Sequence, residues 1–137
     1  MIKIKTGYDC FADDTGLEVD ALNGQPGVFS KRFAGLNASS DDNIDKLLEM
    51  LGNNTNRAAR FKTVISLSKN SELITFEGIC EGNIGYERMG DLGFGYDPVF
   101  IPKNQNISFG QMSLSEKNLI AHRAKAINKL VDYLTNL

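Results

Sequence analysis

The sequence has little of what metal centres, redox sites and membrane proteins need. Only two of its 137 residues are cysteines, Cys10 and Cys80, and neither lies in a Cys-x-x-Cys or Cys-x-x-His spacing. We therefore interpret both as buried or free thiols. No apolar run approaches the roughly 18 residues that cross a bilayer, and no signal-peptide stretch follows the charged start at Met1. We expect a cytoplasmic protein with no membrane partner.

A strong excess of charge is also absent. The chain has 15 basic and 17 acidic side chains and a net charge of −2, so it lacks the basic footprint of a nucleic-acid-binding protein. We expect no nucleic-acid partner. A chain with this balance needs a local basic cluster and a metal to handle a polyanion. No repeat, low-complexity tract or flexible linker divides residues 1–137, which predicts a single domain.

The patterns that are present predict helices and strands. Ser39 or Ser40 can cap a helix that ends at Gly52. The apolar residues of this helix recur at i, i+3, i+4 and i+7: Ile44, Leu47, Leu48 and Leu51. Residues 61–67 and 73–80 are rich in β-branched and apolar side chains, which predicts two strands joined by a polar hairpin connection.

A capping box, Ser113-x-x-Glu116, predicts the start of a C-terminal helix. The apolar stripe expected on this helix has steps of four and three: Ile120, Ala124, Ile127, Val131 and Leu134. Strands beside two amphipathic helices are typical of a layered α/β or α+β domain. This pattern does not specify a function.

Two adjacent carboxylates, Asp13 and Asp14, precede Thr15 and Gly16. Hard divalent cations prefer carboxylate oxygens, and a glycine lets the backbone approach a phosphate closely. An Asp-rich turn that caps a strand explains the same residues, because Asp, Thr and Gly are ordinary turn residues. The segment alone does not decide between the two.

A glycine–aromatic loop follows at residues 93–98, where Phe94 lies between two glycines. Such a loop can present a ring on which a flat base stacks, a contact worth about 1–3 kcal/mol. Asp97 beside the ring can accept a hydrogen bond from a ring nitrogen of the base. The alternative is a tight loop whose aromatic side chains fill the core.

His122 is the only histidine, and Arg123 follows it, so two neighbouring donors suit a carbonyl oxygen or a phosphate. A solvated helix face with scattered charges is the alternative. Lys117 lies earlier on the predicted helix. In a straight helix, Lys117 and His122 would differ by about 140° and lie about 7.5 Å apart along the axis. They can share a ligand only if the ligand is extended or the chain bends between them.

Taken in order, these clusters resemble the inosine triphosphate pyrophosphatase family, also called the Ham1-like family. The resemblance extends over nearly the whole chain, and the segments that carry it are residues 11–22, 24–35 and 93–100, Glu116-Lys117 and His122-Arg123-Ala124. The resemblance implies a twisted mixed sheet with flanking helices and a homodimer. It also implies hydrolysis of abnormal purine nucleoside triphosphates (ITP, dITP, XTP) to the monophosphate and pyrophosphate, with Mg²⁺ as the cofactor.

The resemblance further implies roles for single residues. Asp14 resembles the proton acceptor and a magnesium ligand of the family, with Asp13 supporting it, and His122 with Arg123 resembles the base-recognition pair. The implied substrate contacts are Thr15, Phe94, Gly95, Tyr96, Asp97, Lys117, His122 and Arg123. Thr15 stands where the family usually has a serine and keeps the hydroxyl group.

The sequence departs from the family at its start. Family members begin with a strand and a Thr/Ser-x-Asn-x-x-Lys loop that grips the phosphates, followed by a helix that bears another metal-binding glutamate. None of these elements precedes Asp13 here. We therefore expect an N-terminally truncated domain. The alternative function is a nucleotide-binding fragment with little or no turnover.

Overall fold

The computed structural model describes residues 10–69 and 72–136, and its central element is a five-stranded sheet. The strands lie in the order β2-β1-β3-β4-β5, and every neighbouring pair runs antiparallel. The strands are β1 (Cys10–Val19), β2 (Pro26–Gly27), β3 (Ala58–Lys69), β4 (Glu72–Ile84) and β5 (Phe100–Pro102). The α-helices in the described residues are α1 (Ser40–Leu51), α2 (Leu114–Asn118) and α3 (His122–Thr135). Short 3₁₀ turns are η1 (Asp20–Leu22), η2 (Ser30–Arg32), η3 (Asp97–Val99) and η4 (Phe109–Gln111).

The mixed α and β class expected from the sequence is confirmed. The described strands pair only antiparallel, whereas the resemblance implied a mixed sheet. A parallel pair needs a crossover connection of a dozen or more residues. The long strands β3 and β4 follow each other too closely in the chain for such a crossover, so they form a hairpin.

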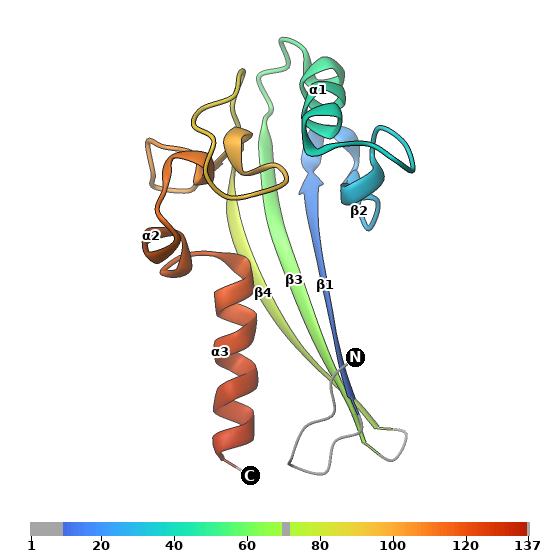
Figure 1. Ribbon diagram of the computed structural model, residues 1–137, viewed down its shortest axis with the longest axis vertical. Coiled ribbons are helices and arrows are strands. Elements are labelled where there is room, and N and C mark those ends of the chain that lie inside the picture. Colours follow the sequence, from blue (N-terminus) through green and yellow to red (C-terminus); the bar gives the residue numbers. More distant parts are fainter. Residues whose placement is uncertain (1–9, 70–71, 137) are drawn as a thin grey trace.

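Helices pack on one face of the sheet. Alternate side chains of β3 are buried on this face: Ala59, Phe61, Thr63, Ile65 and Leu67. Figure 1 shows α3 alongside one end of the long strands and α1 near the other end. Gly78 of β4 lies opposite Thr63 in the register, and a Cβ at Gly78 would overlap the carbonyl oxygen of His122. Because Gly78 has no side chain, the start of α3 can pack directly against the sheet at this position.

The other face of the sheet is polar and carries ion pairs between strands. Arg60 contacts the carboxylates of Glu18, Asp20 and Glu81, and its closest approach is 2.6 Å to Glu81. Partly exposed ion pairs such as these contribute little to stability. The apolar core lies on the opposite face, which the helices cover, and its single cluster includes Leu17, Ile44, Phe61, Phe100 and Phe109.

The first predicted helix and both predicted strands are confirmed. Ser39 caps α1 and accepts a hydrogen bond from the backbone N–H of Asp42, and the helix ends before Gly52, whose φ is 49°. The strands β3 and β4 extend beyond the predicted ranges. Part of their connection, residues 70–71, and the charged start at residues 1–9 lie outside the described residues.

The single C-terminal helix predicted from the sequence is wrong. The capping box of Ser113 and Glu116 is present, but it begins only the short helix α2. The chain turns after Asn118, and α3 begins at His122 without a side-chain cap from Ala121. The bend follows from two packing requirements, because Lys117 reaches into the loop region while α3 must lie along the sheet.

The predicted apolar stripe on this helix is also wrong. The buried residues of α3 are His122 and Ala126, four positions apart, whereas Ile127 and Val131 are 39% and 49% exposed. The predicted stripe assumes one continuous helix, but Ile120 lies in the bend between α2 and α3, so the buried face of α3 differs from the predicted one. None of the described helices combines the length and the apolar character needed to cross a membrane.

Cys80 agrees with the expectation of a buried free thiol. It is 3% exposed, and burial raises the pKa of its thiol. A raised pKa keeps the thiol protonated, which is the opposite of what a reactive cysteine needs.

Candidate active site

Asp97 is the centre of the glycine–aromatic loop. Its side chain is almost fully buried, and Oδ2 accepts hydrogen bonds from the backbone N–H of Phe94 at 2.9 Å and from Lys117 Nζ at 2.6 Å. Gly93 has φ 75°, and a Cβ there would overlap this carboxylate. Asp97 therefore holds the loop closed and fixes the lysine of α2. Oδ2 of Asp97 thus accepts two hydrogen bonds in the absence of any ligand.

Lys117 brings the glycine–aromatic loop and the segment that contains His122 and Arg123 together. It is 8% exposed, and its Nζ lies 4.5 Å from the ring centroid of Phe94 and 5.3 Å from that of Phe109. Cation–π contacts of this geometry add to the ion pair with Asp97. The Phe94 ring remains 73% exposed. An exposed ring on a fixed loop is suited to stacking against a flat base.

Tyr96 faces the scaffold. Its ring is 5% exposed, and its hydroxyl donates to the carbonyl oxygen of Ser30 at 2.6 Å. Burial raises the pKa of the Tyr96 hydroxyl, so the group stays a neutral donor. Ser30 Oγ in turn donates to the carbonyl of Gly27 and accepts from the backbone N–H of Leu17 at 2.9 Å. The Gly24–Gly35 segment thereby connects β1 to the aromatic loop, a link that no single sequence cluster revealed.

His122 opens α3 against the sheet. It is 6% exposed, and its ring stacks on Phe61 with centroids 4.7 Å apart. Burial, and then the charges of Lys117, Arg123 and Lys125, lower the pKa of His122 to about 4. The imidazole is therefore neutral at pH 7, with one donor and one acceptor nitrogen. Its Nδ1 is buried without a hydrogen-bond partner.

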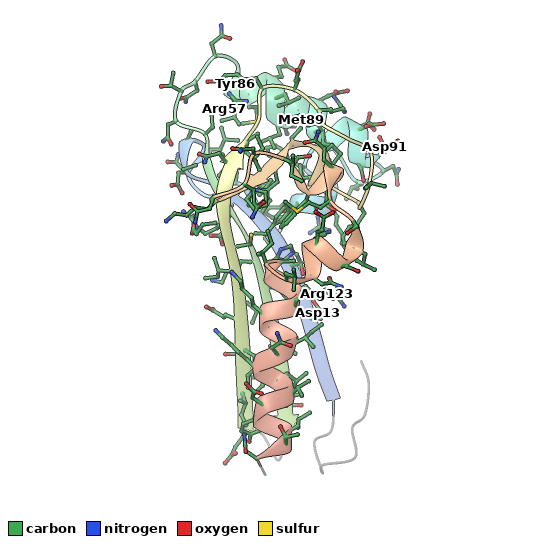
Figure 2. All side chains as sticks on the ribbon, turned by 90° about the vertical axis from the view of Figure 1, so that its left-hand side faces the viewer. Asp13, Arg57, Tyr86, Met89, Asp91 and Arg123 are labelled. Carbon is green, nitrogen blue, oxygen red and sulfur yellow. The ribbon has the colours of Figure 1, made fainter. Side chains whose placement is uncertain are left out.

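Arg123 forms an ion pair with Asp13, one of the two adjacent aspartates. Its Nη2 lies 2.8 Å from Oδ2 of Asp13. Figure 2 shows the two side chains together near the start of α3. The Arg123 side chain is 58% exposed and the Asp13 side chain 19%. Most donors of the guanidinium therefore remain open to a ligand.

The two adjacent aspartates lie on opposite faces of the sheet, because successive strand side chains alternate. Asp13 pairs in register with Ile65, which faces the helices, and Asp14 pairs with Val64. Thr15 returns to the helix side, where its hydroxyl lies 2.8 Å from that of Thr63. Asp14 is exposed on the polar face. The described residues contain no group of three or more His, Cys, Asp or Glu placed to hold a metal ion.

The structure thus joins the three sequence clusters through two ion pairs. Asp13–Arg123 connects the acidic segment to α3, and Lys117–Asp97 connects α2 to the aromatic loop. The bend between α2 and α3 lets Lys117 and His122 face the same region. Gly95, with φ 60°, completes the loop. Of the predicted site residues, Asp14 alone lies on the other face, and the roles of all of them stay predictions.

Two open grooves lie elsewhere. One has a volume of about 640 Å³ and lies beside α1, with these lining residues: Ala34, Asp42, Asp45, Lys46, Glu49 and Met50. The other has a volume of about 370 Å³ and lies between α1 and the segment around Phe29. Neither groove includes a residue that the sequence singled out for chemistry.

Comparison with known proteins gives consistent matches. The model of the Ham1 family matches residues 1–133. A dITP/XTP pyrophosphatase of Flavobacterium johnsoniae is 54% identical over 131 residues, which are 96% of this chain and 68% of that relative. The solved Ham1 protein of Staphylococcus aureus gives a TM-score of 0.89 at 46% identity, over 92% of this chain and 66% of that one. A HAM1 protein of Coxiella burnetii gives 0.89 at 40% identity, over 93% and 67%. The chain spans about two thirds of the length of these relatives.

Proposed function

This chain belongs to the Ham1 family, and from that membership we propose that it hydrolyses ITP, dITP and XTP to the monophosphate and pyrophosphate. Such a reaction removes abnormal purine nucleotides from the nucleotide pool. One observation carries the proposal beyond the similarity itself. The two ion pairs, Asp13–Arg123 and Lys117–Asp97, bring the exposed Phe94 ring, the neutral imidazole and the guanidinium to one side of the sheet.

Recognition of the base is assigned to Phe94, His122 and Arg123. The purine stacks on the Phe94 ring, which the Asp97 hydrogen bond holds in place. His122 and Arg123 direct donors to the oxygen at position 6 of hypoxanthine or xanthine. Adenine carries an amino group there, and a donor facing a donor leaves buried polar groups unpaired at a cost of about 1–3 kcal/mol. Thr15, Gly95, Asp97 and Lys117 complete the proposed substrate contacts, and Tyr96, which is buried, supports the loop.

Hydrolysis is assigned to Asp14, which orients and deprotonates the water that attacks the α-phosphorus. Mg²⁺ commonly binds one or two carboxylates together with substrate phosphates, and the exposed Asp14 carboxylate fits such a shared site. Bound Mg²⁺ would supply charge neutralisation at the phosphates. Asp13 does not fit the same ion, because its side chain lies on the other face and is paired with Arg123.

Residues 10–16 of β1 lie where a nucleotide can contact both faces of the sheet. The only strand beyond β1 is β2, and β2 pairs with Leu17 and Glu18 alone in the described residues. Among the described residues, the rest of β1 has no strand beyond it. In the proposed arrangement the base lies on the helix side of the sheet, and the phosphates pass over residues 10–16 toward Asp14.

A second candidate function is nucleotide binding with little turnover. The separation of Asp14 from the base-reading groups favours it, as does the lack of a three-ligand metal cluster in the described part of the chain. Pyrophosphate release from ITP with Mg²⁺, measured beside ITP affinity by calorimetry, separates the two. Release supports the enzyme, whereas binding without release supports the second function. Absence of both rejects each of them.

The role of Asp14 is tested by Asp14→Asn. We expect loss of pyrophosphate release with unchanged folding. Glu77→Gln is the matched control, since Glu77 lies on the same polar face and pairs with Lys62 at 3.5 Å. If Asp14→Asn releases pyrophosphate as fast as Glu77→Gln and the unchanged chain, Asp14 has no role in the mechanism.

The proposal includes a homodimer, as the resemblance implies. It also keeps the cytoplasmic location expected from the sequence. Exposed apolar side chains support association, with Val28 89% and Leu36 85% exposed. Sedimentation equilibrium of the purified chain tests the dimer, and a monomer at micromolar concentration rejects it.

A further inference from the structure

Asp13 has a role in this structure that its neighbour Asp14 cannot share. The register of β1 turns Asp13 toward the helix side of the sheet, next to the buried Ile65. Its carboxylate is mostly covered and reaches the guanidinium of Arg123 at 2.8 Å. This contact joins β1 directly to the first turn of α3.

Arg123 needs such a partner because its surroundings are positive. It lies in the first turn of α3, where the helix dipole disfavours a cation, and no side chain caps this end. Lys125 follows two positions later, and Lys117 lies close enough to act on the His122 between them. Without a carboxylate, repulsion would turn the flexible guanidinium toward solvent. Among the described residues, Asp13 is the carboxylate that forms an ion pair with Arg123, and it supplies the compensating charge.

The geometry also leaves Arg123 usable. A guanidinium has five N–H donors in a rigid plane, and the contact with Asp13 is made through Nη2. The side chain is still more than half exposed. Fixing one nitrogen sets the plane and direction of the others, so the remaining donors are aimed before a ligand binds.

We propose that Asp13 is a positioning residue that orients Arg123 toward the base and thereby sets the preference for a 6-oxo purine. The inference rests on the proposed function and changes one part of it, because it assigns Asp13 to base selection rather than to the phosphates or the metal. A residue that acts on the reacting phosphates changes kcat for every substrate. A residue that positions Arg123 changes discrimination between bases.

The experiment compares Asp13→Asn with the unchanged chain, using ITP and ATP as probes. Two ratios are measured: kcat/KM for ITP over that for ATP, and the dissociation constant of ATP over that of ITP. We expect Asp13→Asn to lower both ratios at least tenfold, chiefly through KM for ITP, with kcat for ITP within about threefold. Asp13→Glu keeps the charge and should restore part of the ratio. Asp20→Asn is the matched control, because Asp20 directly follows β1, at the start of η1, and its carboxylate contacts Arg60 at 3.0 Å.

A double-mutant cycle tests whether Asp13 acts through Arg123. In an Arg123→Gln background, we expect Asp13→Asn to cause no further loss of discrimination. An additive loss overturns the inference, as does a large fall in kcat with an unchanged ITP/ATP ratio. Thermal unfolding of each variant excludes global misfolding as the cause, and the Asp13→Glu rescue separates charge from packing.

The outcomes distinguish this inference from the proposed function. If the unchanged chain binds ITP without cleaving it, hydrolysis fails, and the dissociation-constant ratio still decides the role of Asp13. If the chain cleaves ITP and Asp13→Asn keeps the full ratio, the positioning role alone fails. If the chain neither binds nor cleaves ITP, both are overturned.

Discussion

The ammonium of Lys117 lies 2.6 Å from the carboxylate of Asp97, although the two residues are only 8% and 2% exposed. A charge pair in such a position is useful mainly because it fixes geometry, since desolvation offsets much of the Coulomb attraction. Here the fixed geometry includes the exposed Phe94 ring, whose backbone N–H bonds to the same carboxylate oxygen. The pair is thus the joint between α2 and the aromatic loop.

Breaking this pair from one side should be costly. Lys117→Met leaves the Asp97 carboxylate buried without its cation, and we expect a loss of about 3–5 kcal/mol in the free energy of unfolding. Lys129→Met, on an exposed position of α3, is the control and should change stability by less than about 0.5 kcal/mol. Urea denaturation followed by circular dichroism measures both. Similar values for the two variants would show that the pair does not hold the loop.

Gly93 and Gly95 allow a matched test of the same loop. Both have positive φ, 75° and 60°, so alanine is strained at either position by about 1–2 kcal/mol. Only at Gly93 would the added Cβ meet the Asp97 carboxylate, which cannot move without losing its two hydrogen bonds. Gly95 has nothing within 4 Å of such a Cβ.

We therefore expect Gly93→Ala to be less stable than Gly95→Ala by about 2 kcal/mol, the usual cost of overpacking. Urea denaturation of the two variants measures this difference. Equal stability would mean that the carboxylate is free to move aside.

Much of the fold could be predicted because local signals agreed with tertiary packing. The α1 helix has a polar cap at Ser39, a regular apolar stripe and a terminal glycine, and each signal holds in the structure. The β3–β4 hairpin has the same kind of agreement. The α2–α3 bend could not be predicted, because neither proline nor glycine marks it. Its cause is the buried contact of Lys117 with Asp97, which are 20 residues apart in the chain.

The candidate site shows the same division. Sequence order and resemblance identified Asp13, Asp97, Lys117 and Arg123, but not which of them touch. Strand alternation could have separated Asp13 from Asp14, yet this required knowing that the segment is a strand and not a turn. The role of Ser30 as a link between β1 and Tyr96 depends on a backbone carbonyl, which no side-chain pattern can reveal.

Gly78 controls the distance between α3 and the sheet. A Cβ at this position would overlap main-chain atoms of His122 and Ala126, and a packed helix backbone cannot yield as a side-chain tip can. We expect Gly78→Ala to destabilise the protein by about 3 kcal/mol. Gly85→Ala is the control, because its Cβ would come no closer than 3.4 Å to the described atoms around it. Thermal unfolding compares the two, and an equal melting temperature would show that α3 does not depend on this close approach.

His122 should make stability depend on pH in a window that a single residue controls. Its pKa in the folded protein is about 4, below the ordinary 6.5, because burial and three neighbouring cations disfavour the charged ring. Between these values the unfolded chain binds a proton that the folded chain does not. Stability is therefore complete above pH 6.5 and falls as the pH drops toward 4, by up to about 3 kcal/mol.

Because the chain has one histidine, His122→Gln should flatten this dependence. Urea denaturation at steps from pH 7 to pH 5 measures the slope, above the range where the helix-capping carboxylates of Asp42 and Glu116 titrate, since hydrogen bonds from their capping serines lower both pKa values. The same slope in both proteins would mean that folding does not lower the pKa of His122, because both states would then bind its proton equally. A pKa near the ordinary 6.5 would leave the imidazole partly charged at pH 7, and the proposed recognition of the 6-oxygen would then include a charged donor.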